Sequence, residues 1–250
     1  MIRSKILYFV FFLFIISCNR GKVRNVHERI NLTSDWFFHQ EGEDSIYKTK
    51  TPSNVHSDLF THKLIQDPFI GNNEIELQWI ETKDWEYTTM FSLDESTLAN
   101  QHLELVFEGL DTYSDVFLND HLLFQSDNMF VEYTKEVKPF LKPRDNELRV
   151  LFHSPLQMNQ QKVNNYPYKL PSGCENTEMK VSPFTRKAAY HFGWDWGPRF
   201  VTMGIWKPVY IRAWNVASIK DVNCVTTSLT KNKAYLKLQI DLLADVEDRK

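Results

Sequence analysis

Several features that would place a chain in a particular class are scarce or absent in this sequence of 250 residues. The formal net charge is −3, so no basic excess is available to bind phosphate backbones, and we expect no nucleic-acid partner. No Cys/His cluster has the spacing of metal ligands, and we expect neither a metal nor another cofactor. Helical periodicity is scarce too. It predicts one short helix, at residues 55–64, with Asn54 as the N-cap.

Cysteine is rare, with three in the chain. Cys174 and Cys224 could pair only in an oxidising compartment and only if their Cα atoms lie within bridging distance. The sequence does not place those atoms. We therefore expect two buried free thiols rather than a disulfide.

Long hydrophobic runs are also missing. The apolar run at residues 6–16 is too short to span a bilayer, but it follows Arg3 and Lys5 in the manner of a signal peptide. We predict that residues 1–18 are a signal peptide of the lipoprotein type and that the mature chain is exported.

The end of this segment carries a lipidation signal. The sequence Ile-Ile-Ser-Cys at residues 15–18 resembles the lipobox of bacterial lipoproteins, in which the cysteine receives the lipid. Cys18 is thus the expected lipidation site, and residues 19–30 form a polar tether to a membrane of the periplasm or cell envelope. The alternative is an ordinary signal peptide with a cysteine at this position by chance.

What the sequence does contain is a pattern of short apolar stretches, broken by turn residues about every ten positions. In residues 147–152 the side chains of Leu148, Val150 and Phe152 fall on one face of an extended chain. In the same way, Leu103, Leu105 and Phe107 share one face, opposite Glu104. Asn119-Asp120 and Asp145-Asn146 are typical of turns. These patterns predict an all-β sandwich or barrel.

The strand pattern also divides the chain. Residues 31–215 are predicted to form one sandwich domain, and the pattern restarts after Ala217 with two strands, at 222–227 and 234–242. Because a lone hairpin is marginal in water, residues 216–250 are expected to be the incomplete start of a second β domain.

An irregular stretch precedes the most unusual part of the sequence. Residues 166–185 hold three prolines and little periodicity, and a loop of this length is usually functional or disordered. We expect residues 166–183 to be mobile. The stretch leads into the sequence HFGWDWGPR at residues 191–199.

Trp194, Asp195 and Trp196 form a candidate sugar site. If this segment is extended, the two indoles share one side and the carboxylate lies on the other, unless Gly193 and Gly197 allow a bulge or a sharp turn. A sugar ring could pack on the indoles while its hydroxyls donate to the carboxylate. The alternative is two core tryptophans beside an aspartate that caps a turn. Nearby cations that could hold the carboxylate are Arg186, Lys187 and Arg199.

The segment RKAAYHFGWDWGPR at residues 186–199 resembles the hallmark of the β-mannosidase branch of glycoside hydrolase family 2. Further pieces that match in order are PSNVHSDL (52–59), DPFIGNNE (67–74), FEGLDTY (107–113), DNMF (127–130) and GIWKPV (204–209). The resemblance implies a jelly-roll sandwich of the sugar-binding type, followed by an immunoglobulin-like domain and a (β/α)₈ barrel. On this reading residues 31–215 are the jelly roll and residues 216–250 the truncated start of the immunoglobulin-like sandwich.

The resemblance also implies roles. The family performs retaining hydrolysis of terminal β-mannosides with two glutamates that lie on the barrel, so no catalytic residue is expected in this chain. Asp195 is expected to accept hydrogen bonds from mannose hydroxyls, and Trp194 and Trp196 to form an apolar wall. Arg186, Arg199 and His191 are expected to support that motif. The implied ligand is a β-mannoside or mannose-containing oligosaccharide.

Three hypotheses follow for the chain as a whole. It is the N-terminal part of a β-mannosidase, with the barrel downstream or on a separate chain; or a stand-alone, lipid-anchored carbohydrate-binding module; or an inactive remnant. Catalysis by local acidic pairs is not expected, because nothing in the sequence raises the pKa of Glu175 and Glu178 or of Asp111 and Asp115. His56 and His191 are expected to be hydrogen-bonded packing residues.

Overall fold

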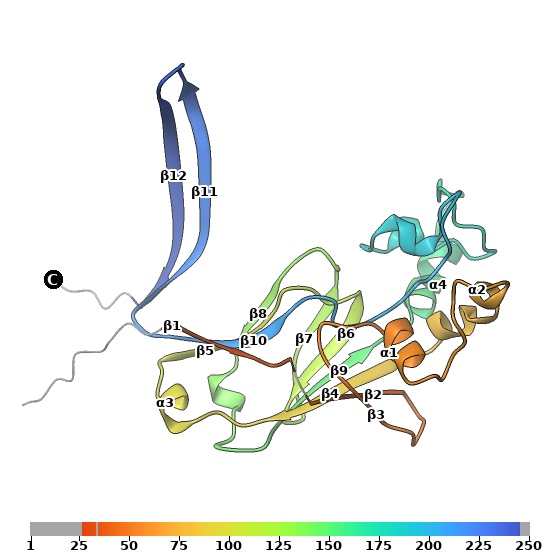
Figure 1. The fold of residues 1–250 in the computed structure, drawn as a ribbon, viewed down its shortest axis with the longest axis horizontal. Helices are drawn as coiled ribbons and strands as arrows, with labels where there is room; N and C mark the ends of the chain where they lie inside the picture. Colours follow the sequence, from red (N-terminus) through yellow and green to blue (C-terminus); the bar gives the residue numbers. More distant parts are fainter. Residues whose placement is uncertain (1–26, 34, 246–250) are drawn as a thin grey trace, which may run out of the picture.

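The computed structural model describes residues 27–33 and 35–245, and its main body is a β-sandwich (Figure 1). The strands of the sandwich are β1 (His27–Asn31), β2 (Trp36–Gln40), β3 (Tyr47–Thr49), β4 (Trp85–Phe91), β5 (His102–Phe107), β6 (Tyr113–Leu118), β7 (His121–Asp127), β8 (Tyr133–Glu136), β9 (Asn146–Phe152) and β10 (Val209–Trp214). They form a four-stranded sheet in the order β1-β10-β5-β8 and a six-stranded sheet in the order β3-β2-β4-β9-β6-β7. All pairings are antiparallel, and the predicted all-β sandwich is confirmed.

The core lies between the two sheets. In β9 every second residue is buried, so that Leu148, Val150 and Phe152 face inward as their alternation predicts. In β5 both faces are covered, and Glu104 is buried rather than exposed on an outer face. Its carboxylate accepts hydrogen bonds from Arg212 Nε at 2.8 Å and from Trp214 Nε1 at 3.0 Å. A charged side chain at a strand position of this kind is buried because two donors on β10 satisfy it.

The predicted turns are confirmed. Asn119 and Asp120 link β6 to β7 with φ angles of 50° and 67°, the pair of positive values that a two-residue hairpin of the right twist needs. Asp145 has a φ of 52° directly before β9. Asn and Asp tolerate these angles better than most other non-glycine side chains, and for this reason their presence in the sequence predicted the turns.

The helical segments are short. They are α1 (Val55–Thr61), α2 (Asn73–Glu76), α3 (Glu95–Leu98), α4 (Pro155–Asn165) and the 3₁₀ turns η1 (Gln78–Thr82), η2 (Lys138–Phe140), η3 (Ser182–Phe184) and η4 (Ala189–Phe192). The predicted helix is α1, and the Asn54 side chain caps it by accepting a hydrogen bond from the Ser57 amide at 3.1 Å. Sequence analysis missed α4, whose polar sequence has weak periodicity, although Ser154 as N-cap and Pro155 at the first turn mark its start. No helix within 27–33 and 35–245 is long and apolar enough to cross a membrane.

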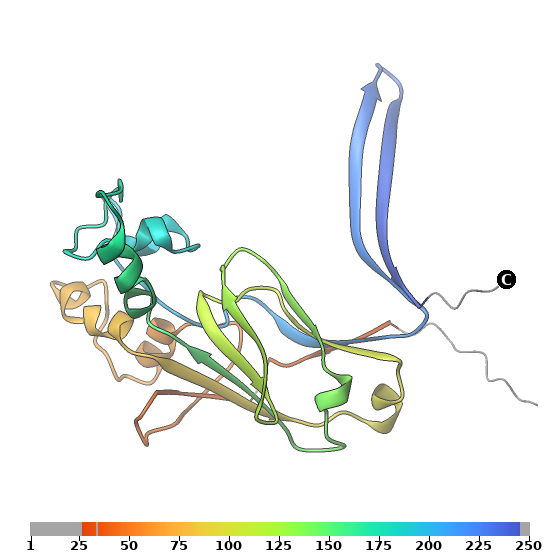
Figure 2. The same cartoon turned by 180° about the vertical axis from the view of Figure 1, so that it is seen from behind.

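Beyond the sandwich, β11 (Ala217–Leu229) and β12 (Ala234–Ala244) form a separate two-stranded sheet, as predicted for this part of the chain. The hairpin extends away from the sandwich in both views (Figures 1 and 2). Its assignment to an immunoglobulin-like domain stays a prediction. Cys224 on β11 and Cys174 are both free, as expected, but both are exposed, so the prediction of buried thiols is wrong. The signal peptide, Cys18 and residues 19–26 of the predicted tether lie outside the described residues. Residues 27–30, also predicted as tether, belong to β1 and pair with β10 in the sandwich.

Candidate functional site

The irregular segments gather at the end of the molecule opposite the β11–β12 hairpin. There α1, α2 and α4 lie near the segment that runs from the end of α4 to the start of β10 (Figures 1 and 2). This segment carries the Trp194-Asp195-Trp196 motif. The fold thus assembles the candidate site from loops at one edge of the sandwich, where side chains are free of the packing of the core.

The motif forms a tight turn rather than an extended strand. The Trp194 amide donates to the Gly197 carbonyl at 3.2 Å, and the Gly197 amide donates to the Trp194 carbonyl at 3.4 Å. Gly193 enters the turn with a φ of 98°, a value that favours glycine. Of the geometries that the sequence left open, the extended segment with both indoles on one side does not form, and the sharp turn that the glycines allow does.

The motif side chains are on the surface. Trp194 is 48% exposed and Trp196 is 84% exposed, and Asp195 is exposed between them. The alternative of two core tryptophans is excluded by these values. Together with Glu74 and Phe69, the turn lines an open cavity of about 340 Å³. Indole faces and a carboxylate are thus presented to the same solvent-filled space.

Arg199 anchors the turn from behind. Its buried guanidinium donates to Glu81 and to Gln78, and its backbone amide donates to Glu74 Oε1 at 2.6 Å. Gln78 in turn donates to the Arg199 carbonyl at 3.0 Å. Arg199 was a candidate to hold the Asp195 carboxylate, but its guanidinium is engaged by Glu81 and Gln78 instead. It supports the motif by tying the end of the turn to α2 and η1.

The other two cations are also engaged elsewhere. Arg186 forms an exposed ion pair with Asp127, and its carbonyl accepts from the Met129 amide at 3.0 Å. Lys187 is fully buried and donates to Asp111 and, at 2.8 Å, to the Thr202 carbonyl. Burial lowers the pKa of Lys187, and the Asp111 carboxylate opposes that shift. Both were candidates to hold Asp195, but within the described residues neither pairs with it, so its carboxylate is accessible to a ligand.

His191 and His56 differ from the hydrogen-bonded packing residues that were expected. In both rings Nδ1 is enclosed and has no hydrogen-bond partner within the described part of the chain. His191 Nδ1 lies 3.8 Å from Asp111 Oδ2, beyond hydrogen-bond length. Burial, and then the positive charge of Lys187, lower the pKa of each ring to about 4. Both imidazoles are therefore neutral at pH 7.

The acidic side chains with raised pKa values are held within the fold. Burial raises the pKa of Asp58, which accepts hydrogen bonds from Thr49, Ser53 and Tyr87. Burial likewise raises the pKa of Glu81, the partner of Arg199. These contacts make both carboxyl groups parts of the scaffold.

The members of the two acidic pairs, Glu175 with Glu178 and Asp111 with Asp115, differ in burial. Glu175 is buried and accepts from the Val181 and Ser182 amides, both at 3.1 Å, and Asp111 is buried under Lys187. Glu178 is exposed, and Asp115 accepts a hydrogen bond from Gln125 Nε2 at 2.7 Å. Among residues 27–33 and 35–245, no group of three or more His, Cys, Asp or Glu side chains is placed to hold a metal ion.

Comparison with known proteins identifies this arrangement. The family model described as "Glycosyl hydrolase 2 galactose-binding domain-like" matches residues 36–207, which include the six-stranded sheet, strands β5 and β8 of the four-stranded sheet, and the tryptophan–aspartate turn. The chain belongs to this family.

The relatives within it are β-mannosidases. Beta-mannosidase B of Thermothelomyces thermophilus is 39% identical over 185 residues, which are 73% of this chain and 21% of that protein. Beta-mannosidase of Capra hircus is 34% identical over 212 residues, or 83% of this chain and 24% of that protein. The chain thus spans about a quarter of the length of these curated relatives, and it is a homologue of their N-terminal part.

Solved structures of related enzymes also resemble this chain. The crystal structure of a β-D-mannosidase from Dictyoglomus thermophilum superimposes with a TM-score of 0.81 at 40% identity, over 87% of this chain and 26% of that one. A β-D-glucuronidase from the same organism has a TM-score of 0.57 at 18% identity, over 86% of this chain and 33% of that one. This second likeness is one of fold alone.

Proposed function

We propose that this chain is the sugar-binding N-terminal part of a β-mannosidase that removes terminal β-D-mannose residues with retention of configuration. The observation that carries the proposal is the exposed turn of Trp194, Asp195 and Trp196, which is held on a buried scaffold. The Asp195 carboxylate has no ion-pair partner within residues 27–33 and 35–245. The homology to β-mannosidases supports it.

In this proposal the turn binds and orients the terminal mannosyl ring. Asp195 accepts hydrogen bonds from ring hydroxyls, and charge-assisted bonds of this kind are about twice as strong as neutral ones. The exposed indole faces pack against the C–H faces of the sugar and shield those bonds from water. Arg199 keeps the turn in place so that less conformational entropy is lost on binding.

The chemical step belongs to another part of the protein. Retaining hydrolysis needs two carboxyl groups about 5 Å apart, one as acid/base and one as nucleophile. We place both on a barrel domain outside this chain, since the buried carboxyl groups described above are tied to the scaffold. The chain alone is then a binding unit without hydrolase activity.

We further propose that the protein is exported and attached to a bacterial envelope membrane through lipid on Cys18. The apolar run at residues 6–16 and the lipobox-like sequence support this proposal. Incorporation of labelled palmitate into the wild type, and its loss in Cys18→Ala, is the expected result. Equal labelling of both would contradict lipidation at this residue.

A calorimetric titration of the mature chain with methyl β-D-mannoside tests the binding role. The wild type should bind, and Asp195→Asn should weaken binding about tenfold, because one charge-assisted hydrogen bond contributes roughly 1.4 kcal/mol or more. Asp241→Asn, a change at an exposed carboxylate of β12, is the matched control and should leave the affinity unchanged.

Two results would contradict the proposal. Absence of mannoside binding, or equal affinity of the wild type and Asp195→Asn, would remove the turn as the sugar site. Release of nitrophenol from p-nitrophenyl β-D-mannoside by the purified chain would show that the catalytic carboxyl groups are not confined to a separate barrel.

A further inference from the structure

The β11–β12 hairpin projects from the sandwich without packing along it. Every side chain of β11 from Ile219 to Leu229 is exposed, and so is every side chain of β12 from Ala234 to Leu242. Figures 1 and 2 show the hairpin standing clear of the sandwich from both sides. The direction of the hairpin is therefore set at its root, where β11 begins and β12 ends.

The chain turns sharply at this root. Val216 joins β10 to β11 with a φ of 65°, and its amide donates to Gln101 Oε1 at 3.2 Å. The Val216 carbonyl accepts from the Asp245 amide at 3.0 Å, so the end of β12 returns to the same point. Asp245 thus lies at the junction of the hairpin and the sandwich.

His102, at the start of β5, contacts carboxylates on both sides of this junction. Its Nδ1 lies 3.2 Å from Glu136 Oε2, at the end of β8, and its Nε2 lies 2.9 Å from Asp245 Oδ2. The ring stacks on Trp214, the last residue of β10, with centroids 3.8 Å apart and 14° between the planes. One imidazole ring thus bridges the sandwich and the end of the hairpin.

Only the protonated ring of His102 satisfies both contacts. An ionised carboxylate accepts hydrogen bonds and has none to donate, whereas a neutral imidazole has one N–H donor and one acceptor nitrogen. Both nitrogens donate when the ring carries a second proton. Loss of that proton leaves a nitrogen lone pair facing a carboxylate, so one of the two contacts is lost.

The surroundings favour the protonated ring. Burial lowers the pKa of His102, but the hydrogen bonds and negative charges of Asp245 and Glu136 outweigh burial and hold this pKa above its ordinary value. The ring is therefore charged under conditions in which an isolated imidazole has begun to lose its proton.

Other charged groups on the neighbouring elements have partners of their own. Glu104 on β5 accepts from Arg212 Nε on β10 at 2.8 Å. Lys138 of η2 donates to the Asn100 carbonyl. Within the described part of the chain, the two carboxylates are therefore the charges that act on the His102 ring.

We propose that His102 is a pH-dependent clamp at the root of the β11–β12 hairpin. The protonated ring bonds to Glu136 and Asp245 at once and fixes the direction of the hairpin on the sandwich. Glu136 is also held by the amides of Leu103 and Lys138, at 3.0 and 3.2 Å, so loss of the proton releases Asp245. This inference does not rest on the proposed function, because the clamp is at the other end of the molecule.

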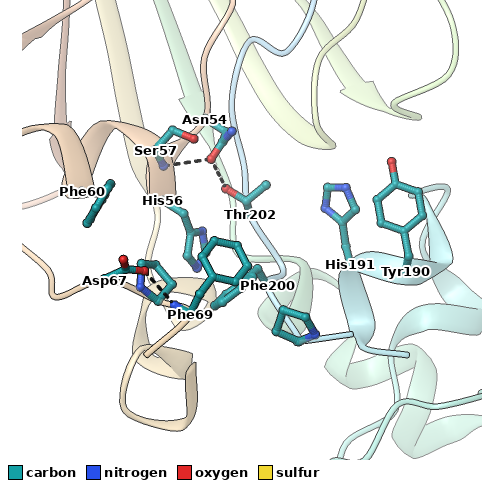
Figure 3. Close-up of a pocket in the computed structure, with 12 residues that line it drawn as sticks. Asn54, His56, Ser57, Phe60, Asp67, Phe69, Tyr190, His191, Phe200 and Thr202 are labelled. Atoms are coloured by element: carbon teal, nitrogen blue, oxygen red, sulfur yellow. Dashed lines mark hydrogen bonds between the residues drawn. The ribbon is translucent and has the colours of Figure 1, made fainter. Parts of the chain in front are cut away.

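The direction of the pH effect follows from the raised pKa. The clamp is fully formed below the ordinary imidazole pKa of 6.5 and is lost as the pH rises through the raised value. His56 and His191, beside the cavity shown in Figure 3, have pKa values of about 4 and stay neutral over this range. A change at the hairpin root above this ordinary value therefore does not come from these two rings.

The two exposed free thiols allow the direction of the hairpin to be measured. Cys224 lies on β11 and Cys174 lies between α4 and η3, so a spin label on each reports the distance from hairpin to sandwich. The parent chain is the mature protein with Cys18→Ala, in which only these two thiols react. Double electron–electron resonance should give a narrow distance distribution at about pH 6, and that narrow distribution should be lost at about pH 9.

Two variants change the clamp and one serves as the matched control. His102→Gln has no charge to gain and should give the broad distribution at both pH values. Asp245→Asn should keep the narrow distribution at both, because an amide can donate to the neutral ring. His153 also lies between two carboxylates, Asp84 at 3.0 Å and Asp115 at 3.3 Å, but away from the hairpin, so His153→Gln should behave as the parent. Thermal melts check that each variant is folded.

Three outcomes would overturn the clamp. Equal distributions of the parent chain at the two pH values would show that the proton on His102 does not hold the hairpin. A pH response that persists in His102→Gln or in Asp245→Asn would place the titrating group elsewhere. Loss of the response in His153→Gln would show that any buried histidine between carboxylates controls it. None of these results bears on the binding of methyl β-D-mannoside at Asp195.

Discussion

The molecule exposes apolar side chains in two regions, and the two are built differently. At the tryptophan–aspartate turn, exposed indoles stand on a buried polar scaffold of Arg199 and its partners. On the β11–β12 hairpin, pairs such as Val222 with Ile240 and Cys224 with Leu238 make one apolar face, while Asp221 pairs with Asp241 on the other. Leu238 and Ile240 are 60% and 51% exposed.

The two regions differ in what holds their exposed apolar side chains in place. At the turn, the buried ion pair of Arg199 and Glu81 holds the exposed aromatic groups in one geometry, a property that binding surfaces share. Within the described residues, the hairpin side chains have no comparable buried ion-pair scaffold. The hairpin's alternation of apolar and polar faces is typical of a sheet that packs against another layer, and its place in a second domain stays a prediction.

The largest effect is expected when the scaffold is broken. Arg199→Met should lower the free energy of unfolding by about 3–5 kcal/mol, because it leaves the Glu81 carboxylate buried without its partner. Arg186→Met, at an exposed pair with Asp127, should cost no more than about 1 kcal/mol. Urea titrations measure both values. Equal losses would mean that the two arginines have the same role, which contradicts the anchored turn.

Truncation of leucine in the two apolar regions comes next. Leu148→Ala in the sandwich core should destabilise the protein by about 2–5 kcal/mol, since it opens a cavity among buried side chains. Leu238→Ala on the hairpin should stay within about 0.5 kcal/mol, because the side chain is exposed. A large loss in Leu238→Ala would show that the hairpin packs against a partner in solution.

The smallest expected effect is the contribution of His56 to the loss of stability between pH 7 and pH 5. The pKa of His56 is about 4 in the folded chain, below the ordinary value of 6.5, so between these values the unfolded chain binds a proton that the folded chain does not. Stability therefore falls as the pH falls through this window. His56→Gln should remove about 2 kcal/mol of the loss between pH 7 and pH 5. Urea titrations at both pH values check this, and an unchanged loss in the variant would place the acid sensitivity elsewhere.

Sequence reasoning reached those parts of the structure that depend on neighbours in the chain. The strand alternation at Leu148, the turn at Asn119 and the cap at Asn54 are local signals, and the structure agrees with each of them. The motif turn was also found from its sequence, although its shape was not.

What was missed depends on contacts between distant residues. Arg199 meets Glu81 across 118 positions of the chain, and Lys187 meets Asp111 across 76. Local spacing made both cations partners of Asp195 because it carries no information on such contacts. In the described part of the chain, Nδ1 of His56 and of His191 has no hydrogen-bond partner. This was missed for the same reason, since a missing partner is visible only in three dimensions.

The most direct test of the central claim is a chemical-shift map of the whole mature chain on addition of methyl β-D-mannoside. Our account predicts saturable shifts of the Trp194 and Trp196 indole signals and the Asp195 amide, with no shifts along β11 and β12. Shifts confined to the hairpin, or none at the turn at saturating sugar, would contradict it.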